Sequence, residues 1–68
     1  MFMVIIDDTK IGVTKVAECN QLAAESMVMK ALTEDGVPKK DIYVFDMRSA
    51  LPFEVETVQH TYVRLFPR

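Results

Sequence analysis

The sequence predicts a small α+β domain in which a four-stranded, mainly antiparallel sheet carries one helix on one face. Two observations lead there. Four runs are rich in β-branched and aromatic residues, as strands are, and one segment between them has helical spacing instead. The expected order is therefore ββαββ. With 68 residues and no linker or internal repeat, the chain is expected to form a single domain over residues 1–68.

The first two runs predict a hairpin. Residues 1–7 place apolar side chains on both faces of a strand, which is typical of an interior position. The turn-forming sequence DDTK follows, and residues 11–18 then alternate with more polar side chains. This second strand should therefore lie at the edge of the sheet.

The helix has clear start and stop signals. Asn20 has the short acceptor side chain of an N-cap, and helical spacing continues over residues 21–35. Gly36 can adopt the left-handed conformation that ends a helix, and Pro38 prevents its continuation. A third strand is then expected over residues 41–47.

The last run, residues 52–67, is too long for one straight strand of so small a domain. Its apolar residues begin on one side of the strand and switch to the other at Val58. The switch predicts a bulge or bend between residues 57 and 60. Residues 53–57 should pair with the third strand, whereas residues 60–66 either cross to the first hairpin or add to a neighbouring chain.

The predicted helix has more apolar surface than one contact needs. Its core stripe consists of Ala24, Val28, Ala31 and Leu32, with Met27 beside them. Leu22 and Met29 lie outside this stripe. Either a partner covers these two residues, or they cap the end of the sheet or are exposed singly, as many apolar side chains are.

The predicted sheet also has apolar surface left uncovered, because its first and third strands are apolar on both sides and the single helix covers only one face. The side chains left facing water are either Met3 and Ile5 or the set Tyr43, Phe45 and Met47. Such a patch usually marks an interaction surface, and face-to-face packing of two sheets in a homodimer would cover it. Alternatively, the sheet curls and buries part of its own second face.

Charge and cysteine content narrow the classes of protein. A net charge of −2 with scattered basic residues argues against nucleic-acid binding. Small secreted domains usually contain several disulfides, whereas this chain has one cysteine, so we expect a cytoplasmic protein. The apolar start, residues 1–6, is too short for a signal peptide or a membrane span.

No catalytic set is apparent, so we expect neither enzymatic activity nor a cofactor. His60 is the single histidine, and its spacing from Cys19 matches no recognised dyad or metal site. Two glycines in total leave no phosphate-binding loop. For Cys19 a buried, inert thiol is the simpler interpretation, and a reactive thiol next to the helix start is the alternative.

Acidic residues at strand ends provide one further alternative. A hard cation could bind to Asp7, Asp8, Asp41 and Asp46 if the strand ends that carry them converge. Aspartates in turns and at strand ends usually need no metal, so we expect no metal site.

These observations favour a small non-catalytic protein–protein interaction module, an accessory, inhibitory or regulatory factor that forms a homodimer and binds another protein. Free-standing chains of this size include such factors encoded by viruses and other mobile elements. The candidate contact residues are Leu22, Met29, Tyr43, Phe45, Met47, Tyr62, Arg64 and Phe66.

Two alternatives stay open. One is a small-molecule-binding or enzymatic domain with a pocket at a dimer interface, whose polar groups would come from Cys19, Tyr43, His60 and Tyr62. The other is a single-stranded nucleic-acid-binding protein. It would stack bases on Tyr43, Phe45 and Tyr62 and hold phosphates with Lys39, Lys40 and Arg64.

Overall fold

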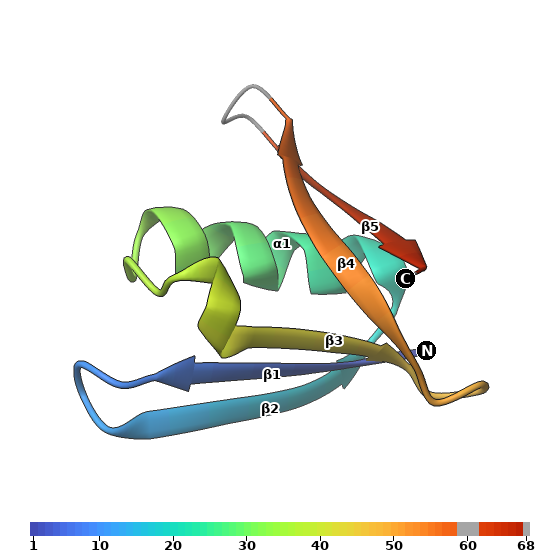
Figure 1. The fold of residues 1–68 in the computed structure, drawn as a ribbon, viewed down its shortest axis with the longest axis horizontal. Helices are drawn as coiled ribbons and strands as arrows, with labels where there is room; N and C mark the ends of the chain where they lie inside the picture. Colours follow the sequence, from blue (N-terminus) through green and yellow to red (C-terminus); the bar gives the residue numbers. More distant parts are fainter. Residues whose placement is uncertain (59–61, 68) are drawn as a thin grey trace.

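The computed structural model describes residues 1–58 and 62–67. Its elements are, in chain order, β1 (Phe2–Asp8), β2 (Val13–Cys19), α1 (Gln21–Thr33), the 3-10 turn η1 (Lys39–Asp41), β3 (Ile42–Asp46), β4 (Leu51–Val58) and β5 (Tyr62–Pro67). The strands form one sheet in the order β2-β1-β3-β4-β5, and every neighbouring pair is antiparallel (Figure 1). The predicted α+β class, with one helix on an antiparallel sheet, is confirmed.

The sheet has five strands because the last apolar run forms two of them. β4 pairs with β3, as expected, and β5 turns back to pair with β4 over the register Phe53↔Pro67 to Val58↔Tyr62. Neither expected partner of the last segment, the first hairpin or a neighbouring chain, is its partner here. The predicted change of direction did identify where one strand ends, although the connecting residues 59–61 lie outside the described part of the chain.

The first hairpin is arranged as predicted, with β1 in the interior of the sheet and β2 at its edge. β2 begins at Val13, two residues later than expected, because Ile11 and Gly12 belong to the turn. Gly12 has φ +67°, a left-handed conformation that glycine adopts without steric cost.

Both predicted signals of the helix, the N-cap at its start and the left-handed glycine after its end, are confirmed. The side chain of Asn20 accepts a hydrogen bond from the backbone N–H of Ala23 at 2.8 Å, so it is the N-cap. α1 ends at Thr33, two residues earlier than expected, and Gly36 then takes φ +64°. The backbone N–H of Val37 donates to the carbonyl of Ala31 at 2.9 Å, which returns the chain toward the sheet.

The core lies between α1 and the face of the sheet that the helix covers. All its members are apolar: Val4, Ile6, Ala24, Val28, Ala31, Val37, Ile42, Val44, Val55, Val63 and Leu65. Predicted stripe members Leu32 and Met27 are partly buried against this cluster. Because the core consists mostly of small and β-branched side chains, the helix can approach the strands closely.

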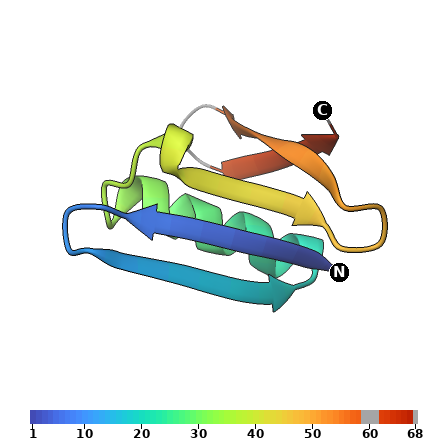
Figure 2. The ribbon, with the colours of Figure 1, turned by 60° about the horizontal axis from the view of Figure 1, so that its bottom comes forward.

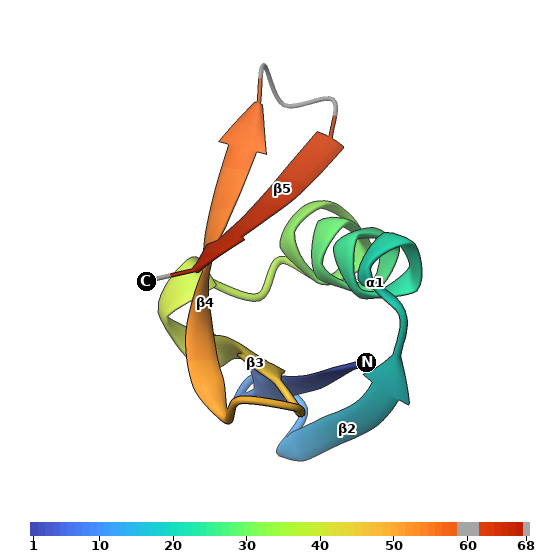
Figure 3. The same cartoon turned by 90° about the vertical axis from the view of Figure 1, so that its right-hand side faces the viewer.

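The sheet curls around the helix. Figure 2 shows β2, β1 and β3 side by side with α1 behind them, and Figure 3 views α1 nearly end-on, with β4 and β5 rising along its side. The curl buries the inner face of the sheet against α1 and leaves the opposite face convex. The sheet therefore does not fold over its own second face, which was the alternative to an exposed patch.

Candidate interaction surface

The side of the sheet opposite α1, here called the outer face, is apolar at its centre. Val4 and Ile6 of β1 are buried toward the helix, so Met3 and Ile5 point to the outer face. The register places Met3 beside Phe45, and Ile5 between Val16 and Tyr43. The sequence left two alternative sets undecided, Met3 with Ile5 and Tyr43 with Phe45 and Met47, and both lie on the same uncovered face.

Part of this apolar face is well exposed, whereas Met3, Ile5 and Phe45 are half-buried. Val16 is 60% exposed, Tyr43 48% and Met47 41%. A shallow apolar hollow of about 430 Å³ lies between strand residues and the β3–β4 turn, and it is lined by Met3, Ile5, Phe45, Met47 and Ala50. Contiguous apolar surface of this kind on a small domain usually marks a contact site.

Acidic residues surround this apolar centre. Among the outward-pointing residues of the described strands, Asp7, Glu18, Glu54 and Glu56 are carboxylates, and Arg64 alone is cationic. Among these strand residues, four negative charges and one positive charge leave an excess of three negative charges. The guanidinium of Arg64 lies 5.1 Å from the centre of the Phe66 ring, where the ring attracts it. The outer face thus combines an apolar centre with an acidic rim.

A second surface is the groove between α1 and β5, with a volume of about 490 Å³. Leu22, which is 74% exposed, and Met29 line its helix side, and Tyr62 and Val63 line its strand side. Leu22 and Met29, which the sequence places outside the core stripe, therefore form one wall of this groove, and Met29 is also partly buried against the core. The sequence did not indicate the groove, since its other wall exists only once β5 returns along α1.

Glu25 connects the two walls of the groove. Its carboxylate accepts a hydrogen bond from the backbone N–H of Leu65 at 3.3 Å, across 40 residues of sequence. That N–H belongs to the free edge of β5, so the side chain of Glu25 replaces the partner that a further strand would supply.

The candidate contact residues thus fall on two surfaces. Tyr43, Phe45 and Met47 lie on the outer face, where the alternation of β5 also places Tyr62, Arg64 and Phe66. Leu22 and Met29 lie in the groove, and Tyr62 lines it as well. Sequence reasoning missed Val16 as a member of the outer face, although it is the one apolar residue between Thr14 and Glu18 on that side of β2.

Of the four residues proposed for an alternative small-molecule pocket, the three that the structure describes are not brought together. Cys19 is half-buried and packs against the core on the helix side of the sheet, whereas Tyr43 lies on the outer face. Tyr62 is on β5, two strands away from β3. His60 lies outside the described residues.

The four aspartates do not converge as one group, although Asp41, just before Ile42, lies at the end of β1 that carries Asp7 and Asp8. The register places Asp46 opposite Phe2, at the end of β1 far from Asp7 and Asp8. Within residues 1–58 and 62–67 no group of three acidic, histidine or cysteine side chains could hold a metal ion. Asp46 instead accepts a hydrogen bond from the backbone N–H of Arg48 at 3.0 Å, which stabilises the turn between β3 and β4.

Asp8 has an environment that the sequence did not predict. It is 6% exposed, on the helix side of β1, and its Oδ1 has no hydrogen-bond partner among the described residues. The sequence predicts a turn at Asp8, but this residue belongs to β1 and continues the alternation of Val4 and Ile6, which is the signal for its burial.

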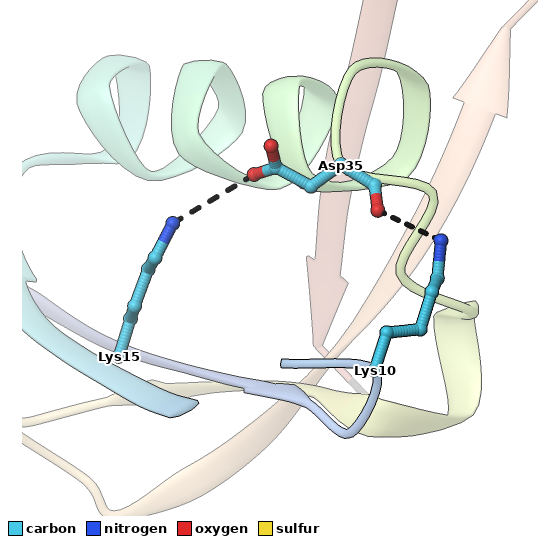
Figure 4. Close-up of polar contacts among 3 residues, drawn as sticks. All are labelled: Lys10, Lys15 and Asp35. Carbon is cyan, nitrogen blue, oxygen red and sulfur yellow. Dashed lines mark hydrogen bonds and ion pairs between the residues drawn. The ribbon is translucent and has the colours of Figure 1, made fainter. Parts of the chain in front are cut away.

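Two lysines of the first hairpin hold it against the end of the helix (Figure 4). The Nζ of Lys10 donates to the backbone carbonyl of Asp35 at 3.1 Å, and the Nζ of Lys15 lies 3.8 Å from the carboxylate of the same residue. Cations are favourable near the carbonyl end of a helix, and both contacts are solvent-accessible, so their contribution is small. We interpret both lysine contacts as structural and not as part of a binding site.

Comparison with known proteins finds no family model, no curated protein and no solved structure that matches this chain. In the part of the chain that the structure describes, no helix has the length and apolar character needed to cross a membrane.

Proposed function

We propose that this chain is a non-catalytic protein–protein interaction module, a homodimeric accessory, inhibitory or regulatory factor of the cytoplasm. The observation that carries the proposal is the uncovered apolar centre of the outer face, with Tyr43, Phe45 and Met47 at its core. Sheets with two apolar faces normally carry a layer on each. Here α1 is one layer, and the partner protein supplies the other.

The acidic rim describes the partner further. An excess of three negative charges among the outward-pointing strand residues favours a partner surface that is apolar in the middle and basic at its border. The same excess disfavours single-stranded nucleic acid, even though Tyr43, Phe45 and Tyr62 share this face, because phosphates would approach the carboxylates of Glu54 and Glu56.

Affinity capture from the native host, with quantitative mass spectrometry, tests the proposal. We expect a protein that co-purifies with the wild-type chain and is lost with Tyr43→Glu and with Met47→Glu, since each places a charge in the apolar centre. Both side chains are exposed, so the fold should persist, and circular dichroism verifies this.

The matched control is Leu22→Glu, which adds the same charge to an exposed apolar residue in the groove. It should leave the captured protein unchanged. Loss of capture with Leu22→Glu but not with the outer-face variants would contradict the proposal and assign binding to the groove. Equal capture by all variants would contradict it too.

A further inference from the structure

We propose that two copies of this chain pair through the open edge of β2, forming a homodimer with one continuous sheet of ten strands. The inference specifies the homodimer of the proposed function, but it rests on a different part of the molecule. The proposed partner protein binds the outer face, whereas the second copy binds the sheet edge.

The sheet has two edges, and they differ in how well they are protected. At β5 the N–H of Leu65 points away from β4 to Glu25. Because backbone directions alternate in an antiparallel ladder, Val63 and Pro67 also face away from β4. Pro67 has no N–H to offer, and α1 lies alongside the strand. The edge at β5 is therefore blocked for most of its length.

The edge at β2 has no such protection. β2 is seven residues long, contains no proline, and forms no backbone hydrogen bond within the described residues except to β1. α1 packs mainly on β1 and β5, so the helix does not cover this edge. The charged side chain of Lys15, which could blunt the edge, instead extends toward Asp35. A long, uncovered edge of this kind is a template for strand addition.

The outer face itself is a poor site for the second copy. A two-fold axis that packs one outer face on another brings the acidic rims together, with four carboxylates and one arginine on each side. Like charges juxtaposed in an interface oppose association. The charge distribution therefore directs the second copy to the edge and leaves the outer face to a basic partner.

The sequence of β2 suits pairing with itself. A two-fold axis perpendicular to the sheet at Val16 pairs all seven residues, with Val16 opposite Val16 of the second copy and Thr14 opposite Glu18. No like charges are directly opposite in this register. An axis at Lys15 would oppose two lysines, and an axis at Ala17 would pair only residues 15–19.

This register also joins the two outer faces. Within one chain, Tyr43, Ile5 and Val16 form a row across β3, β1 and β2. Across the axis, Val16 meets its counterpart, so the row continues through the second copy. The 60% exposed side chain of Val16 gains an apolar neighbour, and the dimer presents one apolar surface in place of two.

Cysteine cross-linking tests the register directly, in a Cys19→Ala background. With Val16→Cys, the two new side chains lie opposite each other, with Cβ atoms about 4.5–5.5 Å apart, so mild oxidation should give a disulfide-linked dimer on a non-reducing gel. Thr14→Cys is the matched control on the same face of the same strand. Its two copies are four residues out of register, about 14 Å apart, and should not cross-link at the same protein concentration.

Sedimentation velocity from micromolar to millimolar concentration provides the second readout. The wild-type chain should dimerise. Val16→Lys, which opposes two lysines at the axis, should weaken dimerisation about tenfold or more. Thr14→Lys adds the same charge opposite Glu18 of the second copy and should leave the dimer intact or tighten it.

Three results would overturn the inference: a wild-type chain that stays monomeric at every concentration, equal cross-linking of the two cysteine variants, or a dimer that Val16→Lys does not weaken. If the wild-type chain is monomeric but captures a protein that Tyr43→Glu does not capture, the edge-paired dimer is refuted and the outer face remains a binding site. A dimer that captures no other protein would keep the edge-paired dimer and refute the outer face as a binding site.

Discussion

Asp8 is buried at a position where the sequence pattern would favour an apolar residue. Its Oδ1 is unpartnered among the described residues, and the unfolded chain would hydrate that atom. A buried polar atom without a partner costs about 1–3 kcal/mol. We predict that Asp8→Val raises the free energy of unfolding by about 1–2 kcal/mol, measured by urea denaturation.

The control for Asp8→Val is Asp7→Val, one residue earlier in β1. The carboxylate of Asp7 is half-buried on the outer face and accepts a hydrogen bond from Thr14 Oγ1 at 3.4 Å. Its replacement should change the free energy of unfolding by no more than about 0.5 kcal/mol. A loss of stability in Asp8→Val would show that the Asp8 carboxylate has a favourable partner in solution.

At the residue scale, local signals in the sequence were reliable. Asn20 could be identified as an N-cap because capping depends on its own side chain and the next three residues. Gly36 could be identified as the left-handed residue just beyond the end of α1 because few other residues adopt its φ of +64°. Both features are set by neighbours in the chain, so no tertiary information was needed.

At the scale of elements, the contact between Glu25 and Leu65 joins α1 to the edge of β5. We predict that Glu25→Ala lowers the free energy of unfolding by about 1 kcal/mol, because the partly buried N–H of Leu65 loses its acceptor. Hydrogen exchange at the Leu65 amide should also become faster.

Glu34→Ala removes an exposed carboxylate just after the same helix and serves as the control. Its free energy of unfolding should stay within about 0.5 kcal/mol of the wild-type value. If the two variants were equally stable and protected the Leu65 amide equally well, the bond would contribute nothing to the edge of β5.

The elements themselves were predicted to different degrees. β1, β2 and β3 followed from alternation and turn residues, with Gly12 shifting the start of β2. The break near Val58 was visible in the same way. The strand that pairs with β5 could not be predicted, because strand pairing depends on contacts between distant residues and the local pattern is compatible with several partners. The groove between α1 and β5 was missed for the same reason.

At the scale of the whole molecule, the outer face was anticipated because counting layers requires no exact topology. One helix covers one face of the sheet. Apolar residues such as Ile5 and Tyr43, which point to the other face, therefore indicated that this second face would be left uncovered. The acidic rim could not be anticipated, since Glu18 and Glu54 share a face only through the strand order β2-β1-β3-β4. Charge and apolar surface together describe the proposed partner more narrowly than either does alone.

The central claim is that the apolar centre of the outer face contacts another protein, and site-specific photo-cross-linking in the native host tests it most directly. A photo-reactive amino acid at position 43 lies on the outer face, and one at position 23 lies on an exposed part of α1. We predict that position 43 yields a cross-link to one particular protein and that position 23 does not. Cross-links to that protein from position 23 alone, or no cross-link from position 43 with the fold intact, would contradict the claim.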